Sequence, residues 1–565
     1  MPPEPFPGLP DVTVERDVPA RMRDGVTLRA DVYRPVEGGP HPVLLARNPY
    51  DKLTAQTGSG YYHPSWWARQ GFVVVAQDCR GRFRSEGVFE PFTNEAKDGY
   101  DTVEWAARLP GSDGRVAMYG FSYPGATQLL AATKRPPSLV AVCPGMTASQ
   151  YYDGWTYQGG ALHLAFAANW AAGLAAYTAI TAGDGPAISR LERALGSSDW
   201  FSHLPLLEPP AFTRTDAPYY FDWLEHESYD DYWRATAIDE DYGRIQVPGL
   251  HVGGWYDIFL SGTVANFRGI GGRQKLLVGP WQHGPWSPLL GDGEDAGPRA
   301  VNDWQLRFLD EVVKGRASGA LDAPATVYVI GDGWRDLDGW PPPGARSVDW
   351  FLHSGGRANS KYGDGTLSPE PPAEEPPDVF AYDPLAPVAS AGGHSCCDDS
   401  LTPMGPRSQH GSERWGDTLV YTSAPLVEDV DLVGDVMVTL HAASTAVDTD
   451  FTAKLCRVSP DGESVNLKQG IVRARFRRSL SAPELLTPGQ VEEYRISLGP
   501  IGVRIPAGYR LRLDVSSSDF PHWDRNLNTG GPLGAEGPER AIVATQTVLH
   551  DGARPSRITL PVLPR

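Results

Sequence analysis

The chain has 565 residues, 41% of them hydrophobic and 21% charged, so it is too long for one ordinary domain and too apolar to be largely disordered. Its 50 basic and 69 acidic side chains give a net charge of −19, which disfavours nucleic acid and anionic membranes as partners. The segment after Met1 has no basic and apolar leader, and no run of about 18 apolar residues occurs, so we expect a cytoplasmic protein without a membrane span.

The first 150 residues alternate short β-branched runs with helical patterns. Strands are predicted at 43–45, 72–75, 115–119 and 139–142, and a helix over 94–109 is stopped by Pro110 and Gly111. The same rhythm resumes with strands at 247–252 and 275–278. This alternation predicts a mostly parallel sheet with helices on both faces.

Residues 151–244 differ from the sequence around them. They carry an Ala-rich helical pattern over 161–180, a second amphipathic helix over 188–195 and many aromatic side chains. A helical insert of this kind within an α/β domain indicates a cap over a pocket. From 348 onward the helical period disappears, and alternating runs at 436–440, 451–455 and 509–515 predict an all-β sandwich, expected to be a jelly roll.

Cysteine is scarce, with five residues in the chain. Neither a CxxC pair nor a histidine cluster such as HExxH is present, so we do not expect a structural zinc site. Cys396 and Cys397 are neighbours, and a disulfide between adjacent residues would close a strained ring. We therefore expect two free thiols in a loop of a reduced protein.

One motif indicates catalysis: the segment 119–125, YGFSYPG, stands directly after a predicted strand and before an apolar helix. This is the nucleophile-elbow arrangement, which exposes a serine hydroxyl and places a helix N-terminus beside developing negative charge. Pro124 stands where the second glycine of the usual motif would fall, and proline is tolerated in the first turn of a helix. Ser122 is therefore the candidate nucleophile.

A nucleophilic serine needs a base and an acid that orients the base, and after an elbow of this kind the chain order is serine, acid, histidine. Asp257 follows the predicted strand at 247–252, and His283 follows the one at 275–278. Both positions lie downstream of Ser122 in the required order. We therefore predict that these three side chains form a catalytic triad.

Other acidic residues are candidates for polar contacts outside the triad. Asp78 also follows a predicted strand, but it precedes Ser122, so its expected role is to pair with Arg80 or Arg82 and shape the loop. Asp153 and the pair at 230–231 lie in the insert, where solvated carboxylates are the default.

Five segments in chain order resemble the bacterial cocaine esterase and X-Pro dipeptidyl-peptidase-like family of serine hydrolases: RNPYDK at 47–52, QDCRGR at 77–82, GFSY at 120–123, GWYD at 254–257 and GPWQH at 279–283. Stretches 446–451 and 519–526 are similar to the sandwich domain of the same family. The resemblance implies the α/β fold class, with an α/β-hydrolase domain over 1–150 and 245–347, a helical cap insert over 151–244 and a C-terminal all-β jelly-roll domain over 348–565.

The resemblance also implies roles for single residues. Ser122 would be the nucleophile, His283 the base and Asp257 its partner, without a metal or a cofactor. The Tyr50 hydroxyl and the Tyr123 backbone N–H would form the oxyanion hole, and the chain has no HGGG-like loop to supply a second backbone donor.

Three aromatic residues stand where cocaine-hydrolysing members of the family hold the aromatic acyl group: Trp155, Trp170 and Phe259. A sandwich-domain loop of the family adds apolar side chains there, whereas this chain has GGHSCCDD at 392–399. The resemblance therefore implies an apolar acyl pocket without assigning cocaine as the substrate.

These features predict a cofactor-independent serine carboxylesterase that acts on small-molecule esters with an apolar or aromatic acyl group, through an acyl-enzyme intermediate. Amide-directed relatives are the alternative: an X-Pro dipeptidyl-peptidase, an α-amino acid ester hydrolase or a β-lactam acylase. Transfer of the acyl group to an alcohol is a further possibility. A non-catalytic glycan-binding protein is disfavoured because the serine, acid and histidine set is complete. Relatives suggest a homodimer.

Overall fold

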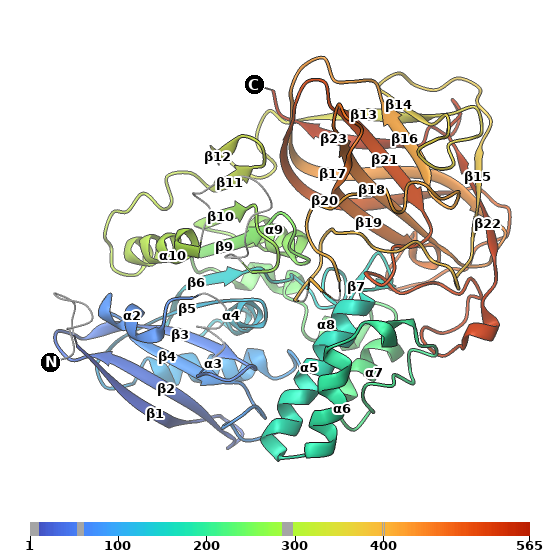
Figure 1. Ribbon diagram of the computed structural model, residues 1–565. Coiled ribbons are helices and arrows are strands. Elements are labelled where there is room, and N and C mark those ends of the chain that lie inside the picture. Colours follow the sequence, from blue (N-terminus) through green and yellow to red (C-terminus); the bar gives the residue numbers. More distant parts are fainter. Residues whose placement is uncertain (1–10, 54–60, 285–297, 398, 401, 565) are drawn as a thin grey trace.

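The computed structural model describes residues 11–53, 61–284, 298–397, 399–400 and 402–564. Figure 1 shows three parts: a sheet flanked by helices in blue to green, a helical insert in teal, and an all-β part in yellow to red. The predicted α/β class with a C-terminal all-β domain is confirmed.

The first sheet has ten strands in the order β1-β2-β4-β3-β5-β6-β9-β10-β11-β12. Their bounds are β1 (Val12–Arg21), β2 (Thr27–Pro35), β3 (His41–Asn48), β4 (Val73–Asp78), β5 (Ser112–Phe121), β6 (Leu139–Gly145), β9 (Gly249–Gly254), β10 (Gln274–Gly279), β11 (Ala325–Val329) and β12 (Gly333–Leu337). Strands β4 to β11 in this order run parallel, and β1, β2 and β12 are antiparallel additions at the two edges. The six predicted strands lie in the parallel centre.

Helices cover both faces of this sheet. Leu44 of β3 packs in one cluster with α2 (Pro64–Arg69) and α10 (Pro298–Val312), whereas Val43 and Leu45 pack in another with α3 (Glu95–Ala106) and α4 (Tyr123–Thr133). Successive residues of a strand point to opposite faces, so this run of apolar residues serves both layers. Helix α9 (Leu260–Gly269) follows β9.

The strand order places a topological switch point in the middle of the sheet. β3 lies between β4 and β5. After β3 the chain forms β4 on one side of it and then crosses to form β5 on the other side. Ligands of open α/β sheets bind at such a switch point, outside the carboxyl ends of the strands. Tyr50 follows β3 and Ser122 follows β5. Asp257 and His283 follow the parallel strands β9 and β10, which lie beyond β6 in the same sheet.

The insert between β6 and β9 is mainly helical. It contains β7 (Tyr157–Gln158), β8 (Ala161–Leu162), α5 (Leu164–Ala182), α6 (Gly185–Leu195), α7 (Pro218–Glu225) and α8 (Asp231–Arg234), with 3₁₀ turns η1 (Asp199–Ser202) and η2 (Asp239–Arg244). The helix predicted from 161 begins at Leu164, because Ala161 and Leu162 pair with β7. The Asp184 carboxylate caps α6 by accepting from Ala187 N at 3.1 Å.

Helix α5 is the one helix in the described part of the chain that is long and apolar enough to cross a membrane, with a mean hydropathy of 1.2 over its best window. The sequence predicts this helix over 161–180, but it contains no run of about 18 apolar residues, because polar residues such as Asn169 interrupt it. Of that window, 61% is buried inside the protein. A helix that is apolar on all sides is expected in the middle of a core, and α5 occupies such a place in the insert.

The all-β part contains β13 (Arg346–His353), β14 (Thr366–Ser368), β15 (Asp378–Tyr382), β16 (Leu419–Ser423), β17 (Val430–Ser444), β18 (Asp450–Val458), β19 (Ser464–Arg473), β20 (Glu492–Ile505), β21 (Arg510–Ser516), β22 (Ala544–Leu549) and β23 (Arg557–Val562), with short turns η3 (Ala474–Phe476) and η4 (Pro538–Arg540). The three predicted runs lie in β17, β18 and β21. Leucine, valine and isoleucine side chains from these strands form its core. The predicted boundary at 348 falls inside β13, which pairs with β23 of this part.

Backbone hydrogen bonds join the all-β part to the rest of the molecule. Ile330 N donates to Gly502 O at 2.9 Å, beside the first sheet. A Cβ atom on Gly502 would lie 2.2 Å from the Trp255 ring, so only glycine permits this approach. Asp524 N donates to Leu162 O of the insert at 2.9 Å. The all-β part is therefore in direct contact with both the loop after β9 and the insert.

Candidate active site

Ser122 occupies a tight turn between β5 and α4. Its φ of 62° and ψ of −128° are unusual for a residue with a side chain, and its N–H donates to Gly145 O of β6 at 2.9 Å. A Cβ atom on Gly120 would lie 2.5 Å from Pro124 Cβ, and one on Gly125 would lie 2.9 Å from Gly145 O. The two glycines of the motif thus allow the strand, turn and helix to pack closely around the serine.

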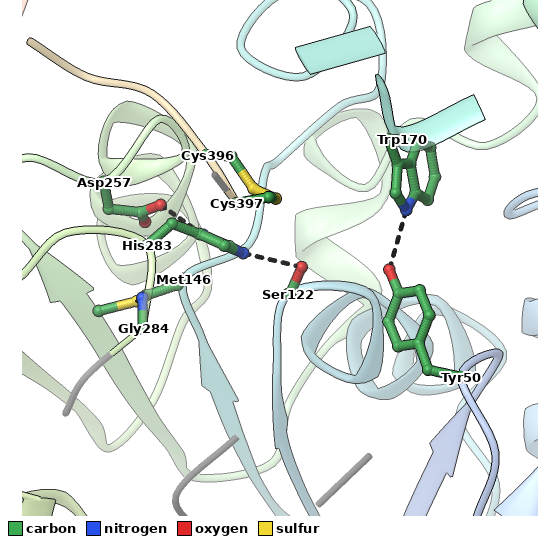
Figure 2. Close-up of a disulfide and its surroundings, with 9 residues drawn as sticks. All are labelled: Tyr50, Ser122, Met146, Trp170, Asp257, His283, Gly284, Cys396 and Cys397. Carbon is green, nitrogen blue, oxygen red and sulfur yellow. Dashed lines mark hydrogen bonds and ion pairs between the residues drawn. A yellow bond between two sulfur atoms is a disulfide. The ribbon is translucent and has the colours of Figure 1, made fainter. Parts of the chain in front are cut away.

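Ser122, His283 and Asp257 form one hydrogen-bonded chain (Figure 2). His283 Nε2 lies 3.1 Å from Ser122 Oγ, and His283 Nδ1 lies 2.8 Å from Asp257 Oδ1. The Asp257 side chain is fully buried and that of His283 is 6% exposed. This geometry lets the imidazole take the serine proton while the carboxylate orients the ring and stabilises its protonated form.

The all-β part contacts the loop that carries Asp257. Lys468 of β19 donates from Nζ to Trp255 O at 2.7 Å. Ser395 and Asp257 form an isolated parallel bridge. Burial lowers the pKa of Lys468 well below its ordinary value. These contacts were not foreseen from the sequence, because they join residues that are far apart in the chain and carry no local pattern.

Tyr50 lies on the side of Ser122 opposite His283 (Figure 2). Its hydroxyl accepts a hydrogen bond from Trp170 Nε1 at 3.0 Å, so its own proton can be donated elsewhere. Burial raises the pKa of Tyr50, which keeps the hydroxyl protonated. The Trp170 contact was not foreseen, and it gives this tryptophan a second role beside its predicted place in the acyl pocket.

Tyr123 is the first residue of α4, so its backbone N–H has no acceptor within the helix. Its side chain points the other way, into the core, where the hydroxyl donates to Glu95 Oε1 at 3.0 Å and accepts from Phe92 N at 2.9 Å. Glu95 also pairs with the fully buried Arg47, with 2.6 Å between NH1 and Oε2. This buried network holds the start of the helix in place beneath Ser122.

The three predicted acyl-pocket residues meet in one aromatic cluster. Trp155 and Phe259 stack with ring centroids 4.1 Å apart, and Trp155 and Trp170 meet edge to face at 5.3 Å. Phe259 also packs edge-on against His283 at 5.1 Å. Trp155 and Phe259 are buried, whereas Trp170 is partly exposed. The cluster therefore joins the predicted base to the insert through uncharged rings.

The prediction for Asp78 is wrong, because its carboxylate pairs with Lys52 at 3.2 Å instead of with Arg80 or Arg82. Lys52 lies in the same loop after β3 as Tyr50, and its backbone N–H also donates to Asp78 Oδ1 at 2.8 Å. Arg80 instead pairs with Asp98 at 2.6 Å. Asp78 therefore helps to fix the loop that carries Tyr50.

The acidic residues of the insert have other partners. Asp153 accepts a hydrogen bond from Gly159 N at 3.0 Å. It lines a cavity of about 350 Å³ behind Asp257, and the residues described as lining that cavity do not include Ser122. Asp230 caps α8 and pairs with His226, and Asp231 pairs with Arg234.

The expectation of two free thiols at 396 and 397 is wrong, because Cys396 and Cys397 form a disulfide. The disulfide lies over the space between His283 and Trp170 (Figure 2). One ligand atom from each of His283, Cys396 and Cys397 lies within 4.8 Å of the other two. Cys396 and Cys397 therefore bring sulfur into the site.

The arrangement can carry out acyl transfer. It contains a serine hydroxyl, an imidazole held by a buried carboxylate, a phenol with a proton to donate and the free amide of a helix N-terminus, as the chemistry of an oxyanion intermediate requires.

Comparisons with known proteins agree with this chemistry. Residues 24–285 match the X-Pro dipeptidyl-peptidase (S15 family) and residues 319–559 match the X-Pro dipeptidyl-peptidase C-terminal non-catalytic domain. The chain is 35% identical to a cocaine esterase from Rhodococcus sp. (strain MB1 Bresler), over 98% of this chain and 99% of that protein. Among solved structures, an aminopeptidase from a marine sediment archaeon (Thaumarchaeota archaeon) is similar with a TM-score of 0.82 and 25% identity, covering 100% of this chain and 99% of that one. An α-amino acid ester hydrolase is similar with a TM-score of 0.80 and 24% identity, covering 98% and 97% of the two chains.

Proposed function

Since the chain belongs to the serine hydrolase family that includes cocaine esterase, we propose that Ser122, His283 and Asp257 catalyse its hydrolysis of small-molecule carboxylic esters. The observation that carries this proposal is the continuous hydrogen-bond chain from Ser122 Oγ through the imidazole to Asp257. Both donor–acceptor distances, 3.1 Å and 2.8 Å, are within the range that proton transfer requires.

The first half of the reaction forms the acyl-enzyme. His283 Nε2 takes the proton of Ser122 as Oγ attacks the ester carbonyl carbon, and the carbonyl electron pair moves onto its oxygen. The Tyr50 hydroxyl and the Tyr123 N–H donate to that oxyanion. When the tetrahedral intermediate collapses, His283 passes the proton to the leaving alcohol and the acyl group stays on Ser122.

The second half releases the acid. Water enters where the alcohol left, His283 takes one of its protons, and the hydroxide oxygen attacks the acyl carbon. The new oxyanion accepts hydrogen bonds from the same two donors. When this second tetrahedral intermediate collapses, His283 returns the proton to Ser122 Oγ. Asp257 keeps its charge throughout and stabilises the imidazolium that forms twice in each turnover.

We propose that the preferred acyl group is apolar or aromatic. The side chains that support this are Trp155, Trp170 and Phe259, whose rings are uncharged and pack close to His283. Aromatic pairs contribute about 0.5–1.5 kcal/mol each beyond simple burial.

Trp170→Ala is expected to lower kcat/KM for a benzoyl ester more than for an acetyl ester of the same alcohol, because the acetyl group barely reaches the ring. The extra loss for the benzoyl ester should be about two- to tenfold. Trp170→Phe is the matched control, since it keeps an aromatic ring of smaller area and removes the N–H that holds Tyr50. It should slow both esters alike. If Trp170→Ala lowers kcat/KM equally for both esters, relative to Trp170→Phe, then Trp170 does not contact the acyl group.

The α-amino acid ester hydrolases and aminopeptidases are the alternative, because solved structures with those names share this fold. Such enzymes would need a carboxylate for a substrate ammonium. Among the carboxylates of the insert, Asp153 accepts a hydrogen bond from Gly159 N and lines a cavity whose described lining does not include Ser122.

Phenylacetyl and phenylglycyl esters of one alcohol decide between these substrate classes, because the two acyl groups differ mainly by the α-ammonium. We expect the phenylacetyl ester to have the higher kcat/KM, since transfer of an ammonium from water to uncharged rings is costly. The measurement is kcat/KM for both esters at a pH where the amine is protonated. A strong preference for phenylglycyl would instead place this protein among the amino-acyl hydrolases.

A further inference from the structure

Residues 392–397 and Asp399 are held beside the predicted triad by contacts on both sides of the two cysteines. Ser395 forms the bridge with Asp257, and His394 Nε2 lies 2.6 Å from Lys468 Nζ. At the other end, Asp399 pairs with Arg407 at 2.7 Å. Cys396 and Cys397 lie between these anchors, so their sulfur atoms are held over the site rather than on a free tail.

The sulfur atoms lie near His283, whose hydrogen bonding is that of a metal-binding histidine. His283 Nδ1 is hydrogen-bonded to Asp257, which leaves Nε2 as the ring nitrogen able to bind a metal ion. Metal-binding histidines usually donate their other ring N–H to a carboxylate, a backbone carbonyl or water, which orients the ring and raises its basicity. The ligand atoms of His283, Cys396 and Cys397 lie within 4.8 Å of one another, close enough for one ion to contact all three after small shifts.

We propose that Cys396, Cys397 and His283 form a binding site for a soft divalent cation such as Zn²⁺ or Cd²⁺ when the disulfide is reduced, and that the bound ion inhibits ester hydrolysis. Two thiolates and one imidazole are ligands that such ions prefer, and they leave a fourth position open. Inhibition follows because the metal ion takes the lone pair of Nε2, which the triad would use to accept the Ser122 proton. The inhibitory part rests on the proposed function, whereas the binding part does not.

Reduction of the disulfide and binding of the cation are two separate steps. A dithiol reductant transfers two electrons and two protons to the disulfide, which opens to two thiols while the reductant closes to its own disulfide. The cation then displaces one proton from each thiol, and two protons are released to solvent. Cys397 is exposed and Cys396 is buried, so a reductant thiolate can reach the sulfur of Cys397.

The charges around the site suit a cation. Two thiolates cancel the charge of a divalent ion, and the Asp257 carboxylate lies behind the imidazole. Lys468 is the amine in contact with this loop, and burial lowers its pKa well below the ordinary value, so it opposes a cation less than an exposed lysine would. In the oxidised protein the two sulfurs are bonded to each other and offer no thiolate, so the site exists only in the reduced state.

Binding is tested on the whole protein without a substrate. One sample is reduced with a dithiol and desalted under nitrogen, a second is kept oxidised, and both are titrated with Cd²⁺. The reduced protein is expected to bind one Cd²⁺ with an ultraviolet cadmium–thiolate band, and the oxidised protein none with that band. Cys396→Ser/Cys397→Ser should lose the band, and His283→Ala should weaken binding by at least about tenfold. Cys143→Ala, which removes a buried free thiol elsewhere, is the matched control and should behave as wild type.

Inhibition is tested separately with Zn²⁺ and a p-nitrophenyl ester. For the reduced wild type, Zn²⁺ should lower the rate of hydrolysis at least about tenfold, and a chelator should restore it. For the oxidised protein and for the double serine variant, the rates with and without Zn²⁺ should be nearly equal. A cadmium–thiolate band that persists in the double serine variant would overturn the site. Equal inhibition of oxidised and reduced protein would overturn the redox dependence. Absence of any ester hydrolysis would concern the proposed function and leave the Cd²⁺ titration as the test of the site.

Discussion

Replacement of Ser122 or His283 by alanine is expected to lower kcat for a p-nitrophenyl ester by about 10⁶-fold, and Asp257→Asn by about 10⁴-fold. Ser122 supplies the electron pair that forms the new bond, and His283 is the base that makes this attack possible at neutral pH. Asp257 holds the imidazole through the 2.8 Å contact to Nδ1, and an amide in its place favours the wrong tautomer.

The three residues act as one unit, so their losses should not add. Ser122→Ala/His283→Ala should be no slower than either single variant. Circular dichroism and Tm of each variant serve as the control for folding. Single losses of less than about tenfold in folded variants, or losses that multiply in the double variant, would contradict a shared triad.

Tyr50→Phe is expected to lower kcat by about 10²–10³-fold with little change in KM. The variant removes one donor directed at charge that develops only in the transition state, and the substrate carbonyl in the ground state gains little from that donor. Tyr177→Phe is the matched control, because the Tyr177 ring lies 6.4 Å from that of Tyr50 and has no assigned role at the oxyanion. A Tyr50→Phe enzyme with nearly wild-type kcat would reduce Tyr50 to a packing residue.

The pKa of Tyr50 sets the pH dependence of this loss. Burial raises it above the ordinary tyrosine value, and a phenol is a donor only below its pKa. Tyr50 should therefore stay protonated through neutral and moderately alkaline pH. The ratio of wild-type to Tyr50→Phe kcat is expected to be constant over that range, and a ratio that falls towards one at mildly alkaline pH would show that the phenol ionises there.

The sequence was informative where the signal is local. The elbow around Ser122 was predictable because strand, turn glycines and helix are contiguous, and Asp257 and His283 stand just after strands with apolar runs. The edge strand β1 was not predicted, because most of its residues are exposed and its apolar and polar residues do not alternate regularly. Its pairing with β2 decides its conformation instead.

Contacts between distant parts of the chain account for the features of the site that the sequence does not predict. The hydrogen bond from Trp170 to Tyr50 joins residues 120 positions apart, and that from Lys468 to Trp255 joins residues 213 apart. No spacing in the sequence reports such contacts. The disulfide between Cys396 and Cys397 was rejected on the cost of a strained ring. The covalent geometry of adjacent cysteines is readable from the sequence, whereas the contacts that hold the loop on both sides are not.

Covalent labelling with a fluorophosphonate tests the central claim most directly, because this probe reacts with a serine that an adjacent base has activated. The labelled protein is digested, and the modified residue is located by mass spectrometry. We expect one label per chain on Ser122, its loss in Ser122→Ala, and much slower labelling in His283→Ala. Labelling that persists in a folded Ser122→Ala protein, or a label on another residue of the wild type, would contradict the assignment of Ser122 as the nucleophile.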